Sequence, residues 1–219
     1  MAKDITLLWG SGSPPCWRIM IALEEKNLQG YNQKLLSFEK GEHKSKEVMD
    51  INPRGQLPSF KCGDKIINES CGVCFFLESK YKSQGTKLIP DCDAEQALMF
   101  QRVFEVNTFG DKMGMLVRRC RICLSFVLPE SVKDISRLLN LFLCDLADTS
   151  GGFLAGKNFS LADVIVFPAI AYLYRFGLSE ERYPKLTEYY KNLMNRPSIK
   201  ATWPPTWKET PGQDILKDI

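Results

Sequence analysis

The sequence predicts an α/β domain followed by an all-helical domain, and three observations support this division. Within the first 82 residues, short apolar runs that suit buried strands alternate with stretches of helical spacing. The segment 83–92 is mostly polar and contains Gly85 and Pro90, which is typical of a linker. Beyond it no convincing strand pattern occurs. We therefore expect one domain at 1–82, a linker at 83–92 and a second domain at 93–219.

The first domain should contain strand, helix, strand, short helix, hairpin and helix in that order. The first strand is an apolar run, and helical spacing begins at Pro14, placing Ile19, Ala22 and Leu23 on one buried face. A Cys-Gly-Asp turn signal joins the two hairpin strands. The expected strands are 5–9, 31–38, 57–61 and 65–68, and the expected long helices are 14 to about 30 and 70 to about 81.

The second domain should contain helices near 93–105, 131–147, 160–176 and 183–195. The start of the third helix is well marked, because Ser160 precedes Asp163 by three residues, as in a capping box. Asp163 could be taken for an active-site acid, but the capping role accounts for it. The region 106–152 fits helical spacing poorly, since Gly110, Gly114 and Pro129 interrupt it and 118–129 suits a strand as well as a helix. Helices nevertheless remain the expectation for this region.

Composition excludes several classes of function. The chain has 219 residues, of which 44% are hydrophobic and 25% charged, with a net charge of +3. This balance is typical of a globular protein and gives no support for nucleic-acid binding. We expect no membrane span, because no apolar run approaches about 20 residues. We also expect a cytoplasmic location, because the N-terminus lacks the pattern of a secretory signal.

The cysteines and the single histidine limit the chemistry further. Eight cysteines at irregular spacing are expected to be free thiols in a reducing compartment. Two pairs, Cys71/Cys74 and Cys120/Cys123, have CxxC spacing, but a zinc site needs four ligands and only one histidine is present. We therefore expect no metal. A serine–histidine–acid triad would depend on His43, and no nucleophile-elbow pattern surrounds a serine.

The stretch Gly10–Arg18 allows two interpretations. In the structural one, Ser13 is the N-cap of a helix whose first turn accepts Pro14 and Pro15. In the functional one, the helix N-terminus and the Ser13 hydroxyl stabilise an anion. A phosphate cradle would need a Gly-Lys pair, which is absent, and a thiolate fits better. Ser13 and Cys16 have the spacing of a thioredoxin CxxC whose first cysteine is replaced by serine, so the reactive sulfur would come from a ligand.

Two later features suggest the ligand. Pro58 begins a strand directly after Leu57, and a cis proline at this place in thioredoxin-like folds leaves the preceding backbone free to pair with an extended peptide. The next strand ends at Glu69 and Ser70, where Ser70 is expected to be a helix N-cap. The helix N-terminus could hold a carboxylate and Glu69 an ammonium group. Together these features suit a small peptide with a central thiol and an α-amino-acid head.

The sequence resembles the cytosolic glutathione S-transferases and looks closest to the rho class, with theta-, delta- and zeta-like features. The resemblance covers about 1–105 and 153–207. It implies a thioredoxin-like glutathione-binding domain, a helical domain carrying a pocket for a hydrophobic electrophile, a homodimer, and detoxification with glutathione as co-substrate and no cofactor. The matching stretches are "SPPCWRIMIALEEKNL", "GEHKSKEVMDINPRGQLPSF", "NES", "FLAGKNFSLADVIVFP" and "YPKLTEYYKNLMNRPSIKATW".

The resemblance also implies roles for individual residues. Ser13 matches the serine whose hydroxyl stabilises the glutathione thiolate, and Ser11 is a second candidate. Trp9 lies near the position where other classes keep a catalytic tyrosine, and Cys16 is expected to be a packed thiol. The residues expected to bind glutathione are Leu57 and Pro58 at its cysteinyl backbone, Glu69 and Ser70 at its γ-glutamyl end, and His43 near its glycyl carboxylate.

Two other functions stay open on the sequence alone. The first is a non-catalytic glutathione-transferase-like module that binds ligands or mediates assembly. The presence of Ser13 and of the Glu69–Ser70 pair favours the enzyme over this module. The second is a thiol–disulfide oxidoreductase using Cys16 or the Cys71/Cys74 pair, which would lack a cysteine at the helix start.

Overall fold

The computed structural model describes residues 2–122, 137, 152–214 and 216–217. The chain divides into two compact units, each of which is described by itself. Unit 1 comprises Met1–Leu88 and Asn195–Pro211, and unit 2 comprises Ile89–Met194 and Gly212–Ile219. Apart from residue 137, the helix expected at 131–147 lies outside the described residues, as does Pro129.

Unit 1 is built on a four-stranded sheet in the order β2-β1-β3-β4. Strand β1 (Ile5–Trp9) pairs in parallel with β2 (Asn32–Leu35), whereas β3 (Ser59–Cys62) is antiparallel to both β1 and β4 (Lys65–Ile67). The four expected strands are therefore present with some bounds corrected. The second and fourth are shorter than predicted, and the third begins at Ser59, so the expectation that Pro58 begins this strand is wrong. Because β1, β2 and β4 share one direction, the loops that follow them lie at the same edge of the sheet as the loop that precedes β3.

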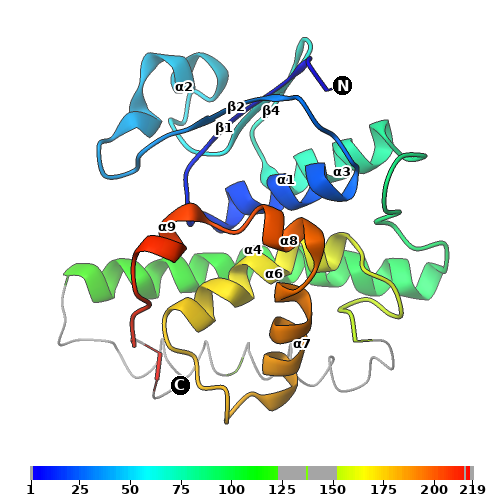
Figure 1. The fold of residues 1–219 in the computed structure, drawn as a ribbon, viewed down its shortest axis with the longest axis vertical. Helices are drawn as coiled ribbons and strands as arrows, with labels where there is room; N and C mark the ends of the chain where they lie inside the picture. The colour runs from blue at the N-terminus through cyan, green and yellow to red at the C-terminus, as the bar shows by residue number, and fades with distance from the viewer. Residues whose placement is uncertain (1, 123–136, 138–151, 215, 218–219) are drawn as a thin grey trace. The chain divides into compact units, whose positions relative to one another are not determined.

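Two helices, α1 (Pro14–Glu25) and α3 (Ser70–Lys80), pack side by side on one side of the sheet (Figure 1). The predicted apolar face of α1 is fully buried at Ile19, Ala22 and Leu23. The connection between β2 and β3 contains the short helices η1 (Glu42–Lys44) and α2 (Lys46–Ile51). The expected βαβ and ββα order is thus confirmed.

Helix α1 ends at Glu25, earlier than the expected stop near Gly30. Asn27 has a φ of 51°, in the left-handed region that asparagine tolerates better than most residues. Its N–H donates to the carbonyl of Glu24, and the N–H of Leu28 donates to that of Leu23, each at 2.9 Å. These two bonds form a Schellman motif, in which asparagine takes the place that the prediction gave to glycine.

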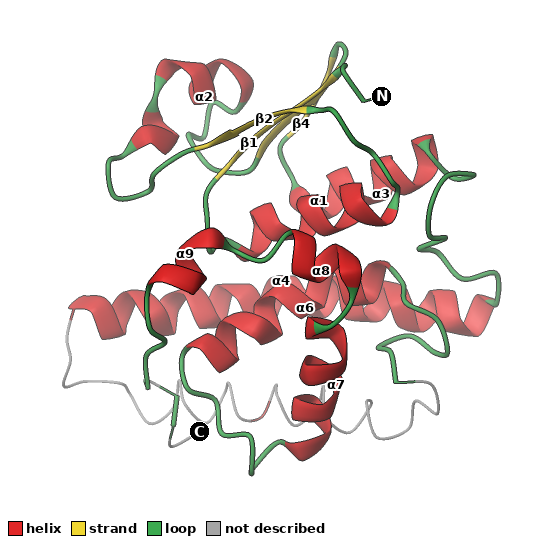
Figure 2. Cartoon of the chain, in the orientation of Figure 1, coloured by secondary structure: helices red, strands yellow, loops and turns green. Residues whose placement is uncertain are grey.

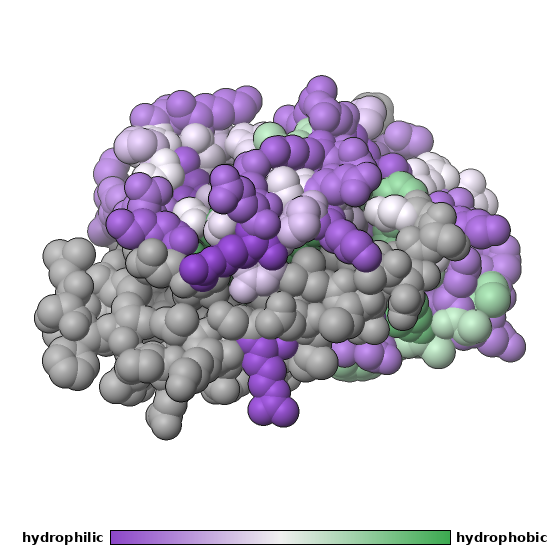
Figure 3. Space-filling model, turned by 90° about the horizontal axis from the view of Figure 1, so that it is seen from below, coloured by the Kyte–Doolittle hydropathy of each residue, from purple (hydrophilic) through white to green (hydrophobic). Residues whose placement is uncertain are grey.

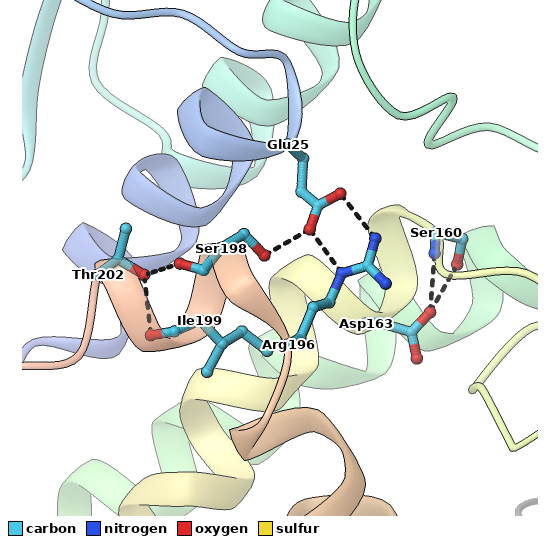
Figure 4. Close-up of polar contacts among 7 residues, drawn as sticks. All are labelled: Glu25, Ser160, Asp163, Arg196, Ser198, Ile199 and Thr202. Atoms are coloured by element: carbon cyan, nitrogen blue, oxygen red, sulfur yellow. Dashed lines mark hydrogen bonds and ion pairs between the residues drawn. The ribbon is translucent and has the colours of Figure 1, made fainter.

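The segment that returns to unit 1 contains α8 (Pro197–Ala201) and α9 (Pro205–Glu209). Arg196 donates to the two carboxylate oxygens of Glu25 from Nε at 2.6 Å and from Nη2 at 2.7 Å, and Ser198 also donates to this carboxylate (Figure 4). Although burial opposes the effect, these hydrogen bonds hold the pKa of Glu25 below its usual value. The ion pair attaches the returning segment to the end of α1.

Arg196→Met should therefore destabilise the protein by about 2 kcal/mol, because it leaves the buried Glu25 carboxylate without its main partner. Since the native pKa of Glu25 is lowered, this loss should be full above about pH 5 and should shrink as the pH falls through the native pKa. Urea unfolding of both proteins across this pH range measures it. Lys34→Met is the matched control, because the Lys34–Glu47 pair is exposed and its loss should cost below about 1 kcal/mol. Equal losses in the two variants would contradict the prediction.

In its described part, unit 2 consists of helices and loops (Figure 2). Its helices are α4 (Asp93–Ile122), α6 (Leu161–Arg175) and α7 (Pro184–Met194). Helix α4 continues through Gly110 and Gly114, so it runs beyond the end expected near 105, and 118–122 is helical, which is the expectation for this region. A glycine costs only about 1 kcal/mol in a helix interior, which the packing of α4 along α6 outweighs.

The predicted capping box at the start of α6 is confirmed (Figure 4). Ser160 Oγ accepts from the N–H of Ala162 at 3.3 Å, and Asp163 Oδ2 accepts from the N–H of Ser160 at 2.9 Å and from the Ser160 hydroxyl at 3.1 Å. The other carboxylate oxygen, Oδ1, accepts from the N–H of Leu154 at 2.9 Å and from the hydroxyl of Tyr189 at 3.1 Å. Asp163 therefore joins α6, α7 and the loop before α6.

The face shown in Figure 3 is mostly hydrophilic where its residues are described, with smaller apolar patches. Some large apolar side chains remain exposed, including Phe104 at 66%. Among the helices that the structure describes, none combines the length and the apolar character needed to cross a membrane.

Candidate functional site

Four loops meet at the edge of the sheet where β1, β2 and β4 end. They are residues 10–13, which lead into α1, residues 36–45 after β2, residues 52–58 before β3, and residues 68–69 before α3. Every residue that the resemblance assigns to thiolate stabilisation or glutathione binding lies in one of these loops or at the first residue of the following helix. Ligands of open α/β sheets commonly bind beyond the carboxyl ends of the strands, which makes this edge the candidate site.

The structure distinguishes the two candidate hydroxyl groups. Ser13 occupies the N-cap position of α1 with extended backbone, but its side chain makes no capping hydrogen bond, so the expected capping role is wrong in that respect. Ser11 is engaged elsewhere: its Oγ lies 2.7 Å from Thr206 Oγ1 and accepts from the Thr206 N–H at 3.2 Å. The Ser13 hydroxyl thus caps no backbone N–H of the helix, although it hydrogen-bonds to the Cys16 side chain, whereas Ser11 is bonded to the returning segment.

Cys16 is a packed thiol with 1% exposure. Burial raises its pKa to about 11, against the opposing effect of a hydrogen bond from the Gly10 N–H at 3.4 Å. Burial also raises the pKa of Cys74. Both sulfurs are therefore protonated near neutrality, which weakens the oxidoreductase interpretation. Among the described residues, no group of three His, Cys, Asp or Glu side chains is arranged to hold a metal ion.

The Leu57–Pro58 peptide bond is cis, as expected. The Leu57 side chain is 8% exposed and so anchors the loop in the core. No hydrogen bond joins the Leu57 backbone to any other group in the part of the chain that the structure describes. Its N–H and C=O are consequently available to a ligand with an extended backbone.

The start of α3 differs from the prediction by one residue. Glu69 is the N-cap and Ser70 is the first helical residue, so the expectation that Ser70 caps the helix is wrong. Ser70 is 7% exposed, and its Oγ accepts from Arg18 Nη1 at 3.2 Å. The exposed Glu69 carboxylate pairs with Arg54 Nη1 at 2.8 Å. The sequence interpretation missed both arginines, although an arginine three residues before Leu57 was a usable signal.

Four buried polar side-chain atoms near this edge lack a hydrogen-bond partner among the described residues. They are Trp9 Nε1, His43 Nδ1, Ser45 Oγ and Asn68 Oδ1. His43 lies in η1 with its ring 5.4 Å from that of Phe38. Buried polar atoms are rarely left unpaired, so an accumulation of them after β1, β2 and β4 points to a polar ligand or ordered water there.

Known proteins share this architecture over the whole chain. A family model for the glutathione S-transferase N-terminal domain matches residues 12–80, and one for the C-terminal domain matches residues 127–197. Glutathione S-transferase A of the plaice Pleuronectes platessa is 63% identical over 230 residues, covering 100% of both chains.

Solved structures of glutathione transferases are similar to this chain as well. A glutathione S-transferase from the Antarctic clam Laternula elliptica has a TM-score of 0.90 at 37% identity and covers 98% of this chain and 99% of its own. The glutathione transferase URE2P6 from Phanerochaete chrysosporium, in complex with oxidized glutathione, has a TM-score of 0.78 at 27% identity, covering 94% and 96%.

A thioredoxin-like α/β domain combined with a helical C-terminal domain is the fold of the glutathione-dependent transferases. The chain belongs to the cytosolic glutathione S-transferase family, whose co-substrate is glutathione.

Proposed function

We propose that the protein is a serine-type transferase of the rho class that conjugates glutathione to small hydrophobic electrophiles, a detoxification reaction. The observation that carries this proposal is the Ser13 hydroxyl, which stands at the N-terminus of α1 without a capping bond while Ser11 is bonded to Thr206. A hydroxyl in this position can donate to a thiolate placed above the helix N-terminus.

The proposed chemistry is thiolate stabilisation. The partial positive charge at a helix N-terminus contributes about 0.3–1 kcal/mol, and a charge-assisted hydrogen bond from Ser13 about 1.5–3 kcal/mol. Together they would lower the pKa of the glutathione thiol by about one to three units. The thiolate sulfur then attacks the electrophilic carbon and forms the C–S bond. In a substitution the leaving group departs with the bonding electrons, and in an addition the carbanion takes up a proton.

The proposed glutathione site uses the four loops at the sheet edge. The Leu57 backbone, before Pro58, would pair with the cysteinyl unit. Ser70, whose Oγ accepts a hydrogen bond from Arg18, would bind the γ-glutamyl carboxylate, and Glu69 would pair with the γ-glutamyl ammonium group. His43 would lie near the glycyl carboxylate, where its buried Nδ1 would gain a partner.

The proposal extends to organisation and location. Residues 1–82 would form the glutathione-binding domain and 83–92 the linker, and residues 93–219 would carry the electrophile pocket. We further propose a cytoplasmic homodimer. The resemblance of the chain to the cytosolic transferases supports both statements.

The experiment that tests the function is a pH titration of glutathione bound to the purified protein, followed by the ultraviolet absorbance of the thiolate. A thiolate that forms well below the pH needed by free glutathione would support the activating site. Glutathione that binds but stays protonated would instead indicate a non-catalytic binding module, and a lack of binding would contradict both.

Glu69→Ala should weaken glutathione binding by about ten- to a hundredfold, because an ionised hydrogen-bond partner is worth about 1.5–3 kcal/mol. Isothermal titration calorimetry measures the effect. Asp64→Ala is the matched control, since Asp64 is also an exposed acid paired with a base, Lys65, in the β3–β4 turn. Unchanged affinity in Glu69→Ala would remove Glu69 from the γ-glutamyl site.

A further inference from the structure

A cluster of three reactive side chains lies at the edge of the sheet opposite the glutathione site. Cys62 ends β3, Asp4 precedes β1, and Lys80 ends α3. Lys80 Nζ is 2.9 Å from Cys62 Sγ and 3.1 Å from Asp4 Oδ2, and the thiol of Cys62 donates to the same Oδ2 at 3.2 Å. An amine, a thiol and a carboxylate are therefore in mutual contact.

The cluster is held in place from several directions. Cys62 is a free cysteine with only 3% exposure, fixed by strand pairing with Ile5. The Lys80 ammonium lies 5.7 Å from the ring centre of Phe76 and 5.4 Å from that of Tyr81, within the range of cation–π attraction. Two reacting groups that are held in place react faster than mobile ones, because the protein has already brought them into the orientation that the reaction needs.

The side chains of Lys80 and Asp4 are 38% and 47% exposed, so the cluster opens to solvent beside the sulfur. Hydrogen bonds from Cys62 and Lys80 hold the pKa of Asp4 below its usual value, which leaves an ionised acceptor for the thiol proton. The same contacts raise the pKa of Lys80, so its nitrogen begins as an ammonium group. Proton acceptor and proton donor thus both flank the sulfur.

We propose that Cys62 is an oxidation site at which hydrogen peroxide creates a covalent sulfur–nitrogen cross-link to Lys80. In the first step the Cys62 sulfur, its proton passed to Asp4, attacks one peroxide oxygen. The O–O bond breaks, and the departing hydroxide takes that proton and leaves as water. The product is a Cys62 sulfenic acid, oxidised by two electrons, while the peroxide is reduced by two.

In the second step the Lys80 ammonium group first releases one proton to solvent, and the lone pair of the resulting neutral amine attacks the oxidised sulfur. The S–N bond forms, the S–O bond breaks, and the hydroxide leaves as water with one proton from the nitrogen. Sulfenic acids condense with backbone nitrogen to give sulfenamides, and the proposal extends this reaction to the lysine amine. Overall, one thiol, one amine and one peroxide give one sulfenamide and two waters. Without a nearby amine, a sulfenic acid that meets no thiol advances to sulfinic and sulfonic acids.

The test treats the whole protein with hydrogen peroxide and analyses it by intact-mass and peptide mass spectrometry. The expected product joins the Cys62 and Lys80 peptides with a loss of about 2 Da, and dithiothreitol separates them again. Exposed Cys92 is an internal comparison, since it should gain oxygen or form disulfides without a lysine cross-link. A Cys62 that stays reduced, gains only oxygen, or pairs with another cysteine would overturn the proposal.

Two lysine variants make the test specific. Lys80→Arg keeps the positive charge but removes the amine, so the cross-link should disappear and Cys62 should gain oxygen instead. Lys65→Arg is the matched control. Like Lys80, Lys65 pairs with an aspartate, its Nζ lying 2.7 Å from Asp64 Oδ2, but it is not among the hydrogen-bonding partners of the Cys62 sulfur. It should leave the cross-link unchanged. A linked product that survives in Lys80→Arg would refute the assignment of Lys80.

Discussion

Ser13→Ala should lower kcat/KM for glutathione conjugation by about ten- to a hundredfold or more, with nearly unchanged affinity for glutathione. The reason is that the hydroxyl interacts with the charged sulfur, and loss of a charge-assisted hydrogen bond costs about 1.5–3 kcal/mol. The contacts to the rest of the peptide would remain. Steady-state kinetics combined with the thiolate titration measures the effect, and the pKa of bound glutathione should rise by about one to two units.

Ser11→Ala is the matched control for this prediction. The Ser11 hydroxyl contacts Thr206, so its loss should perturb the attachment of the returning segment and leave the thiolate titration close to that of the wild type. Thr206→Val should behave like Ser11→Ala, because it removes the other half of the same hydroxyl pair. If Ser11→Ala raised the pKa of bound glutathione and Ser13→Ala did not, the catalytic role would belong to Ser11.

Much of the site could be predicted because local sequence rules determine it. The βαβ order predicts that β1 and β2 are parallel, the hairpin predicts that β3 and β4 are antiparallel, and the resemblance to a thioredoxin-like domain implies that β4 runs with β1. That direction brings Ser13, Leu57 and Glu69 to one edge before any long-range contact is known. The capping box at Ser160 was equally readable, since it depends on residues only three positions apart.

Interactions between distant residues could not be read from the sequence. Glu25 and Arg196 are 171 positions apart, and nothing in either neighbourhood indicates that they form a buried pair. The linker is a similar case: Lys26 donates to Glu78 at 2.6 Å and to the carbonyl of Thr86 at 2.9 Å, so the beginning of the linker is attached to unit 1. The polar composition of residues 83–92 indicated only a linker between the two domains, not these hydrogen bonds.

Two local errors have physical causes. The end of α1 was misplaced because Asn27, rather than Gly30, adopts the left-handed conformation that terminates the helix. The end of α4 was placed near 105, but the helix continues through Gly110, where a Cβ would meet nothing within 4 Å, so no close contact requires a glycine there. Glycine alone is a weak stop signal when neighbouring helices supply packing energy.

Asp163→Ala should destabilise the protein by about 3–5 kcal/mol, a large share of the 5–15 kcal/mol typical of native proteins. The side chain is fully buried, and its removal leaves the N–H groups of Leu154 and Ser160 and the hydroxyl of Tyr189 without their acceptor. Each stranded donor costs about 1–3 kcal/mol. Urea unfolding measures the loss, and Asp64→Ala, which changes a highly exposed carboxylate, should cost far less.

The pH dependence of this loss distinguishes the buried carboxyl from an ordinary surface acid. Burial raises the pKa of Asp163 to about 6, although its four hydrogen bonds favour the ionised form. A group whose native pKa lies above its unfolded value gives its full linkage contribution below the unfolded pKa, near pH 4, and loses it as the pH rises through about 6. The difference in unfolding free energy between wild type and Asp163→Ala should therefore decrease from pH 4 to pH 7. A difference that grows over this range would mean that the hydrogen bonds outweigh burial and that the native carboxyl ionises more readily than the unfolded one.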